Sequence, residues 1–156
     1  MTSNSRGEES LATALRPLHK AWLEDARRFL DPARVRDADF WTRWAAVRYI
    51  CDDFQERYHR ERALLGELRP FLQPQVAERL AHEGERVSAL RLELDRIGRR
   101  RGTAAEFAAG AGGLLDQLGR WCADIERATE GVQRAVLTPE GTEVLMHLEA
   151  AGSIPR

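Results

Sequence analysis

Two glutamates stand at positions where the residue pattern calls for apolar side chains, and they are the first candidates for chemistry. Glu61 and Glu83 each lie eleven residues from Leu72, the centre of a predicted turn between two helices. An ordinary antiparallel hairpin therefore places both carboxylates at one height. Facing buried carboxylates repel unless a metal ion, a shared proton or an arginine lies between them. A carboxylate-bridged metal is the functional prediction. The alternatives are a solvated end of the helices or a guanidinium from one of three arginines, Arg62, Arg79 or Arg86.

The four histidines are the next candidates, because a neutral imidazole binds metals and titrates near neutral pH. His19 falls within the apolar arc of the first predicted helix, where it is either a hydrogen-bonded core residue or a ligand. His59 and His82 lie about 100° or more from the centres of their apolar seams, by the 3.6-residue helical period. Only a rotation of their helices turns them inward. His147 is predicted to lie on the surface.

Motifs for other kinds of site are weak or missing. Glu56 and His59 have the Glu-x-x-His spacing of di-iron bundles, but such a bundle needs two of these pairs, and the last long helix offers none. The chain has no GxGxxG, P-loop, GxSxG or HExxH sequence. Nothing therefore points to nucleophilic catalysis, and an enzyme is the less favoured of the functional hypotheses. Glu61 and Glu83 are the only candidates for an acid or base.

The elements that position these residues are predicted to be amphipathic helices. Ser10 is a plausible N-cap for a first helix, which ends at Asp31-Pro32, with Pro17 either kinking it or starting its main part. A second helix is predicted over residues 37–69. Its apolar seam alternates steps of four and three residues, the rhythm of bundle packing. The seam consists of Phe40, Trp44, Val47, Cys51, Phe54, Tyr58, Glu61, Leu65 and Leu68.

Two further long helices and a short one follow. The third is predicted over residues 75–100 and ends in an arginine triplet whose cations suit a helix C-terminus. The fourth is predicted over residues 103–136. Its Gly110, Gly112 and Gly113 either allow close helix approach or mark a bend. Thr138 caps a fifth helix through Leu148. Short connections between long helices favour antiparallel neighbours.

Length and composition set the fold class. The chain has 156 residues, 43% hydrophobic and 31% charged, with 24 basic and 25 acidic residues and a net charge of −1. We predict an all-α protein, an antiparallel up-down four-helix bundle with a short fifth C-terminal helix, formed by residues 10–150. Residues 1–9 are predicted to be a disordered arm and residues 151–156 a loose tail. Cys51 and Cys122 are predicted to be buried thiols, with a functional disulfide or redox sensor as the alternative.

The same features exclude several partners and suggest a location. The balanced charge argues against a nucleic-acid-binding protein, which is expected to carry a basic stripe. No apolar run approaches the roughly 20 residues that span a bilayer, so we predict no membrane partner. The polar N-terminal sequence shows no secretory signal, and we expect a cytoplasmic protein.

The layout resembles the hemerythrin-like family over residues 11–136. The resemblance is carried by Leu15-Arg16-Pro17-Leu18-His19, by Tyr58-His59-Arg60-Glu61, by Leu80-Ala81-His82-Glu83, and by the stretch from Leu118 to Glu126. That family holds two non-haem irons with histidines and carboxylates from four helices. The resemblance implies a site for iron or manganese, both of which suit such ligands. The implied ligands are His19, His59, Glu61, His82, Glu83 and Glu126.

The chain departs from that family at two positions. Ala63 stands where the second helix of the family carries a glutamate, and Trp121 stands where its last helix carries a histidine. Two functions follow from the sequence. One is a hemerythrin-like bundle that binds a non-haem metal or a small ligand for sensing or storage. The other is a metal-free, degenerate bundle that acts as a protein-interaction or regulatory module, with a homodimer or another protein as its partner.

Overall fold

The computed structural model describes residues 8–36, 40–99 and 103–152, and within them the chain is all-helical, as predicted. Its long helices are α2 (Leu11–Leu30), α6 (Pro74–Arg99) and α7 (Ala104–Ala128). Between α2 and α6 the chain forms a run of helical turns in this order: α4 (Phe40–Tyr49), a π-helical turn (Ile50–Phe54) and α5 (Gln55–Leu68). Shorter elements are α3 (Pro32–Arg36), 3-10 turns at Arg69–Phe71 and Arg134–Val136, and α8 (Pro139–Gly152). None of the described helices is both long and apolar enough to cross a bilayer.

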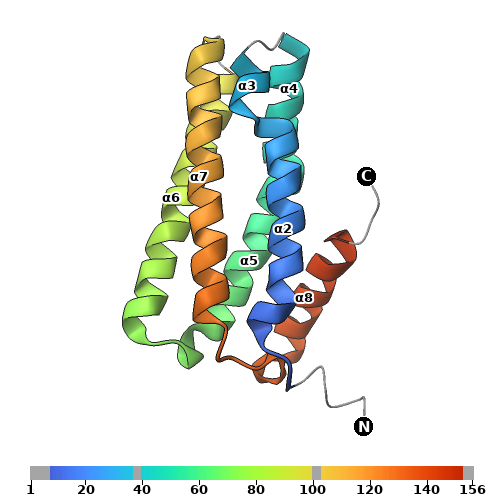
Figure 1. The fold of residues 1–156 in the computed structure, drawn as a ribbon, viewed down its shortest axis with the longest axis vertical. Helices are drawn as coiled ribbons and strands as arrows, with labels where there is room; N and C mark the ends of the chain where they lie inside the picture. The colour runs from blue at the N-terminus through green and yellow to red at the C-terminus, as the bar shows by residue number, and fades with distance from the viewer. Residues whose placement is uncertain (1–7, 37–39, 100–102, 153–156) are drawn as a thin grey trace.

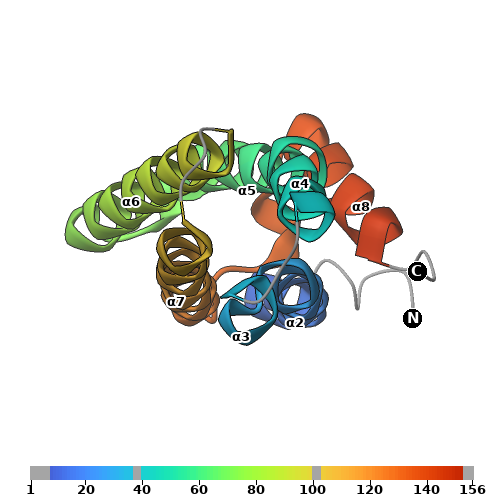
Figure 2. The same ribbon diagram turned by 90° about the horizontal axis from the view of Figure 1, so that it is seen from above.

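The long helices lie side by side around a common core (Figures 1 and 2). Helix α7 packs against both α6 and α2, and α3 also packs on α7. Helix α8 lies outside, against α5 and α2. Figure 2 shows α6 running obliquely outward from the other helices. The part of α6 that lies lowest in Figure 1 therefore diverges from α5. Glu61 lies on α5 and Glu83 on α6, so this divergence bears on their predicted meeting.

An aromatic cluster fills the centre of the core. Trp22 of α2 packs on Phe54 with ring centroids 5.3 Å apart and on Trp121 of α7 with centroids 6.3 Å apart. Tyr58 of α5 lies 5.2 Å from Trp121 in an edge-to-face contact. Both indole rings are almost completely buried. Edge-to-face pairs add about 0.5–1.5 kcal/mol each beyond the burial of apolar area, so these rings fix how α2, α5 and α7 pack.

Several predicted helix ends are confirmed and one is wrong. Helix α2 starts after Ser10 and continues through Pro17, and α7 starts after Thr103, whose hydroxyl accepts a hydrogen bond from the Glu106 amide. Helix α7 ends at Ala128, not at residue 136. The physical reason is that the following chain pairs with the start of α2, where the Leu11 amide donates to the Val132 carbonyl over 2.7 Å.

The predicted seam of the second helix is wrong at its first two positions, while Val47 is buried and Cys51 half-buried as predicted. Phe40 and Trp44 are exposed, whereas Ala46 and Ile50 are buried instead. The π-helical turn at Ile50–Phe54 explains the difference. It inserts one residue into the helical repeat and thereby rotates everything before it relative to everything after it. From Phe54 onward the predicted seam is buried or half-buried.

Gly110 and Gly112 of α7 lie where neighbouring helices come close, which was one of the two alternatives predicted for the glycines of this helix. A Cβ on Gly110 would lie 3.0 Å from Leu94 Cδ1 on α6, and one on Gly112 would lie 3.3 Å from Pro32 Cγ on α3. Gly113 has no such neighbour. The predicted arm at residues 1–9 lies outside the described residues except for Glu8 and Glu9, and so do the tail from residue 153 and the Arg100-Arg101-Gly102 end of the third helix.

Candidate functional site

A histidine held between two carboxylates forms the most unusual polar group of the core. His19 of α2 lies 2.6 Å through Nε2 from Glu61 Oε1 of α5, and 3.0 Å through Nδ1 from Glu126 Oε2 of α7. His19 and Glu61 are almost fully buried, while Glu126 is partly exposed. These three residues, the buried triad, join three helices by hydrogen bonds that use both nitrogens of one ring.

The buried triad carries a proton that an isolated histidine would lose near neutral pH. Burial lowers the pKa of His19, but the charge of Glu61 and the hydrogen bonds to both carboxylates outweigh it and raise that pKa from 6.5 to about 10. At neutral pH His19 is therefore an imidazolium that donates from both nitrogens. Burial, together with the charges of Glu61 and Glu126, also raises the pKa of the Cys122 thiol well above its usual range, so this neighbouring cysteine stays protonated.

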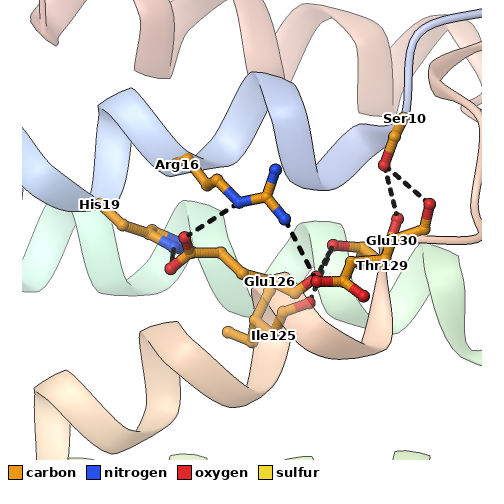
Figure 3. Close-up of polar contacts among 7 residues, drawn as sticks. All are labelled: Ser10, Arg16, His19, Ile125, Glu126, Thr129 and Glu130. Carbon is orange, nitrogen blue, oxygen red and sulfur yellow. Dashed lines mark hydrogen bonds and ion pairs between the residues drawn. The ribbon is translucent and has the colours of Figure 1, made fainter.

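The exposed side of the buried triad is bordered by further polar contacts between α2 and α7 (Figure 3). The Arg16 guanidinium lies 3.9 Å from Glu126 and 3.2 Å from Glu130. The Ser10 hydroxyl contacts the carbonyls of Thr129 and Glu130, at 3.2 and 2.9 Å. Arg16 thus supplies a second cation to Glu126, and the end of α7 is tied to the start of α2.

A second buried ion pair joins α2 and α5, one to two helical turns from His19 and Glu61. Arg57 of α5 donates to Asp25 of α2 over 2.9 Å, and both side chains are about nine-tenths buried. Our sequence reasoning missed both residues. A signal was present for Asp25, since it lies between Trp22 and Ala26 on the apolar arc of α2. A weaker signal was present for Arg57, which lies three residues after Phe54 and four before Glu61, both on the predicted seam.

Glu61 and Glu83 do not share a partner. Glu61 binds His19, whereas Glu83 of α6 faces Asp124 of α7. Burial, a hydrogen bond with Asp124 and the charge of that carboxylate raise the pKa of Glu83 to about 7, while Arg79 and Arg86 oppose the rise. Two of the three proposed arginines thus lie near Glu83. The third, Arg62, lies over the Tyr58 ring, with its guanidinium carbon 5.8 Å from the ring centroid.

The other predicted ligands lie away from the buried triad. His59 and His82 are exposed, in keeping with their predicted positions on the flanks of their seams. His147 is also exposed, near Glu143 at 3.7 Å. Of the six residues implied by the hemerythrin-like resemblance, the structure brings together His19, Glu61 and Glu126. Among the described residues, no group of three or more His, Cys, Asp or Glu side chains has an arrangement that could hold a metal ion.

The buried triad as arranged does not fit a non-haem metal. Each nitrogen of His19 faces a carboxylate oxygen, Nε2 that of Glu61 and Nδ1 that of Glu126, so in this arrangement neither nitrogen is open to a metal. The two carboxylates bind opposite sides of the ring, so their oxygens do not converge on one point. Trp121, which stands where the resemblance places a histidine, is fully buried against Trp22 and Tyr58.

The fold and the site together define an all-helical protein with a protonated histidine buried between two carboxylates. Comparisons of the chain with family models, with curated proteins and with solved structures gave no match.

Proposed function

We propose that this chain is a metal-free four-helix bundle that acts as an interaction module, and that it pairs with a second copy of itself through α4. The observation that carries the proposal is an exposed aromatic face. Phe40, Trp41 and Trp44 are 62%, 69% and 49% exposed. They contact one another edge to face, with centroids 5.4 and 6.4 Å apart. Clustered exposed aromatic side chains are typical of protein interfaces.

The buried triad supports the metal-free part of the proposal. Its imidazolium already compensates the buried carboxylate of Glu61 and the partly exposed one of Glu126, which is the role that a metal would otherwise fill. Trp121, which stands where the resemblance places a histidine, is fully buried against Trp22. A metal could bind His19 only after the ring lost a proton that two carboxylates hold in place.

The charges beside the aromatic face favour a second copy as the partner. Arg48 lies 5.4 Å from the Trp44 ring centroid and pairs with Asp52 at 3.4 Å, all on the exposed side of α4 and the following turn. A two-fold axis crossing α4 between Trp44 and Arg48 sets each Arg48 against the partner's Trp44. Because the flank holds both signs of charge and the chain has a net charge of only −1, two copies meet without strong repulsion.

The test is sedimentation equilibrium over a concentration series with a matched pair of variants. We expect the wild-type chain to dimerise, and Trp41→Ala/Trp44→Ala to raise the dimer dissociation constant at least about 30-fold, since central aromatic residues contribute about 2 kcal/mol or more. Phe71→Ala, which removes an equally exposed ring from another face, is expected to change nothing. A wild-type chain that stays monomeric, or a double variant that dimerises as tightly, would contradict the proposal. Expression with iron and manganese available is expected to give protein without stoichiometric metal.

A further inference from the structure

A cavity of about 180 Å³ opens between α5, the following 3-10 turn, α6 and α7. It lies apart from the exposed aromatic face of α4. Leu65 and Leu80 contribute apolar walls, Arg62 and Arg69 contribute cations, and Gly84 and Trp121 also line it. For scale, an apolar cavity of about 150 Å³ in another protein binds benzene. The space therefore suits a ligand built around one six-membered ring.

The indole nitrogen of Trp121 is enclosed in the wall behind this cavity. The residue is fully buried, and its Nε1 is inaccessible to solvent and has no hydrogen-bond partner among the described residues. Nε1 lies 3.7 Å from the point that a Cβ on Gly84 would occupy. Gly84 and Trp121 therefore pack closely together and form one wall of the cavity.

Gly84 sets how close this wall stands to the cavity. It is buried in the middle of α6. A Cβ would make ordinary contacts there, 3.6 Å from the Tyr58 hydroxyl oxygen and 3.7 Å from Trp121 Nε1. A longer side chain would extend past these contacts into the cavity and fill part of it.

The charge at the cavity has one sign. Arg62 and Arg69 are its only charged lining residues within the described chain, and neither forms an ion pair with a described carboxylate. Arg62 stacks over Tyr58, which fixes its guanidinium beside the opening. Guanidinium groups bind carboxylates through two parallel hydrogen bonds. An anionic head is therefore favoured at the mouth, and an apolar body inside.

We propose that this cavity binds a small carboxylate with an aromatic or similarly compact apolar body. The body packs against Leu65 and Leu80, and the carboxylate meets Arg62 and Arg69. This binding does not depend on self-association through α4, so either proposal can fail while the other stands.

The test is isothermal titration calorimetry of the full chain with 3-phenylpropanoate and with its neutral counterpart 3-phenylpropan-1-ol. The acid is expected to bind at one site with a dissociation constant of about 0.1–1 mM, as is typical for a ligand of this size, and the alcohol at least tenfold more weakly. Gly84→Leu is expected to abolish binding. The matched control Gly119→Leu adds the same side chain at a helical glycine with no neighbour within 4 Å, and it is expected to bind normally.

The arginines give a second measurement that does not depend on the glycine variant folding. Arg62→Gln/Arg69→Gln changes two exposed residues and is expected to weaken binding of the acid at least tenfold, while Arg96→Gln on the far part of α6 leaves it unchanged. The proposal is overturned if the acid does not bind at millimolar concentration. It is also overturned if the alcohol binds equally well, if a folded Gly84→Leu variant keeps full affinity, or if the paired arginine variant does.

Discussion

Replacing His19 with leucine is expected to destabilise the chain by about 3–5 kcal/mol at neutral pH, the range observed when one partner of a buried ion pair is removed. Leucine is of similar size to histidine, so lost packing contributes little. The large term is the charge of Glu61, which is buried and whose Oε1 then loses the imidazolium 2.6 Å away. Total stabilities of small domains are about 5–15 kcal/mol, so the loss is a large fraction of the whole.

Two further variants show that the loss comes from the unpaired charge. His19→Leu/Glu61→Met removes the fully buried charges together, and it is expected to recover most of the stability, because well-packed apolar replacements of buried ion pairs are often neutral or stabilising. Glu126 is partly exposed and keeps Arg16 nearby. His147→Leu changes an exposed histidine and is expected to shift the free energy of unfolding by less than about 0.5 kcal/mol. Urea unfolding followed by circular dichroism measures all three. A His19→Leu variant as stable as the wild type would contradict the account.

The stability of the wild-type chain is expected to fall by several kcal/mol as the pH rises from neutrality to about 10. The pKa of His19 is raised from 6.5 to about 10 on folding. Its stabilising contribution is therefore complete below pH 6.5 and is lost as the pH rises through about 10, because the folded state then holds a proton that the unfolded state has released. The groups that face the ring are Glu61 on α5 and Glu126 on α7, with Arg16 beyond the latter.

Glu83 and Cys122 titrate in neighbouring pH ranges, and the variant His19→Leu/Glu61→Met separates their contributions from that of His19. The pKa of Glu83 is raised from 4.5 to about 7, so the free energy of unfolding also falls as the pH rises from 4.5 to about 7. The raised pKa of the Cys122 thiol adds a loss above its ordinary value of 9. Urea unfolding across this range should give a steep decline in the wild type and a much shallower one in His19→Leu/Glu61→Met. Equal slopes in both proteins would show that His19 does not hold its proton.

The elements of the fold were predictable where local chemistry sets them. Ser10, Asp31-Pro32 and Thr103 mark helix ends that the structure confirms within a residue or two. The π-helical turn at Ile50–Phe54 was not predictable, since a seam is traced by assuming one constant period. A single inserted residue then turned Phe40 and Trp44 from predicted core residues into the exposed face of α4.

The residues of the site could be predicted from the sequence more easily than their arrangement in space. His19 as a core histidine, Glu61 on an apolar seam and Glu126 near the last ligand position were all found. Their meeting was not, because the expected pairing of Glu61 with Glu83 assumed that α5 and α6 pack closely along their whole length. Helix α6 leans away from α5, so Glu61 turns to α2 while Glu83 turns to Asp124 on α7. Relative helix inclination depends on packing across the whole core, and no local spacing encodes it.

The most direct test of the buried triad is nitrogen NMR of the His19 ring, assigned by comparison with His19→Leu and followed from neutral to alkaline pH. We expect both ring nitrogens to carry protons at neutral pH, with protection from solvent exchange, and the ring to lose a proton only near pH 10. A neutral ring with one bare nitrogen at neutral pH, or ring signals shifted by bound iron or manganese, would contradict the claim that His19 itself supplies the charge between Glu61 and Glu126.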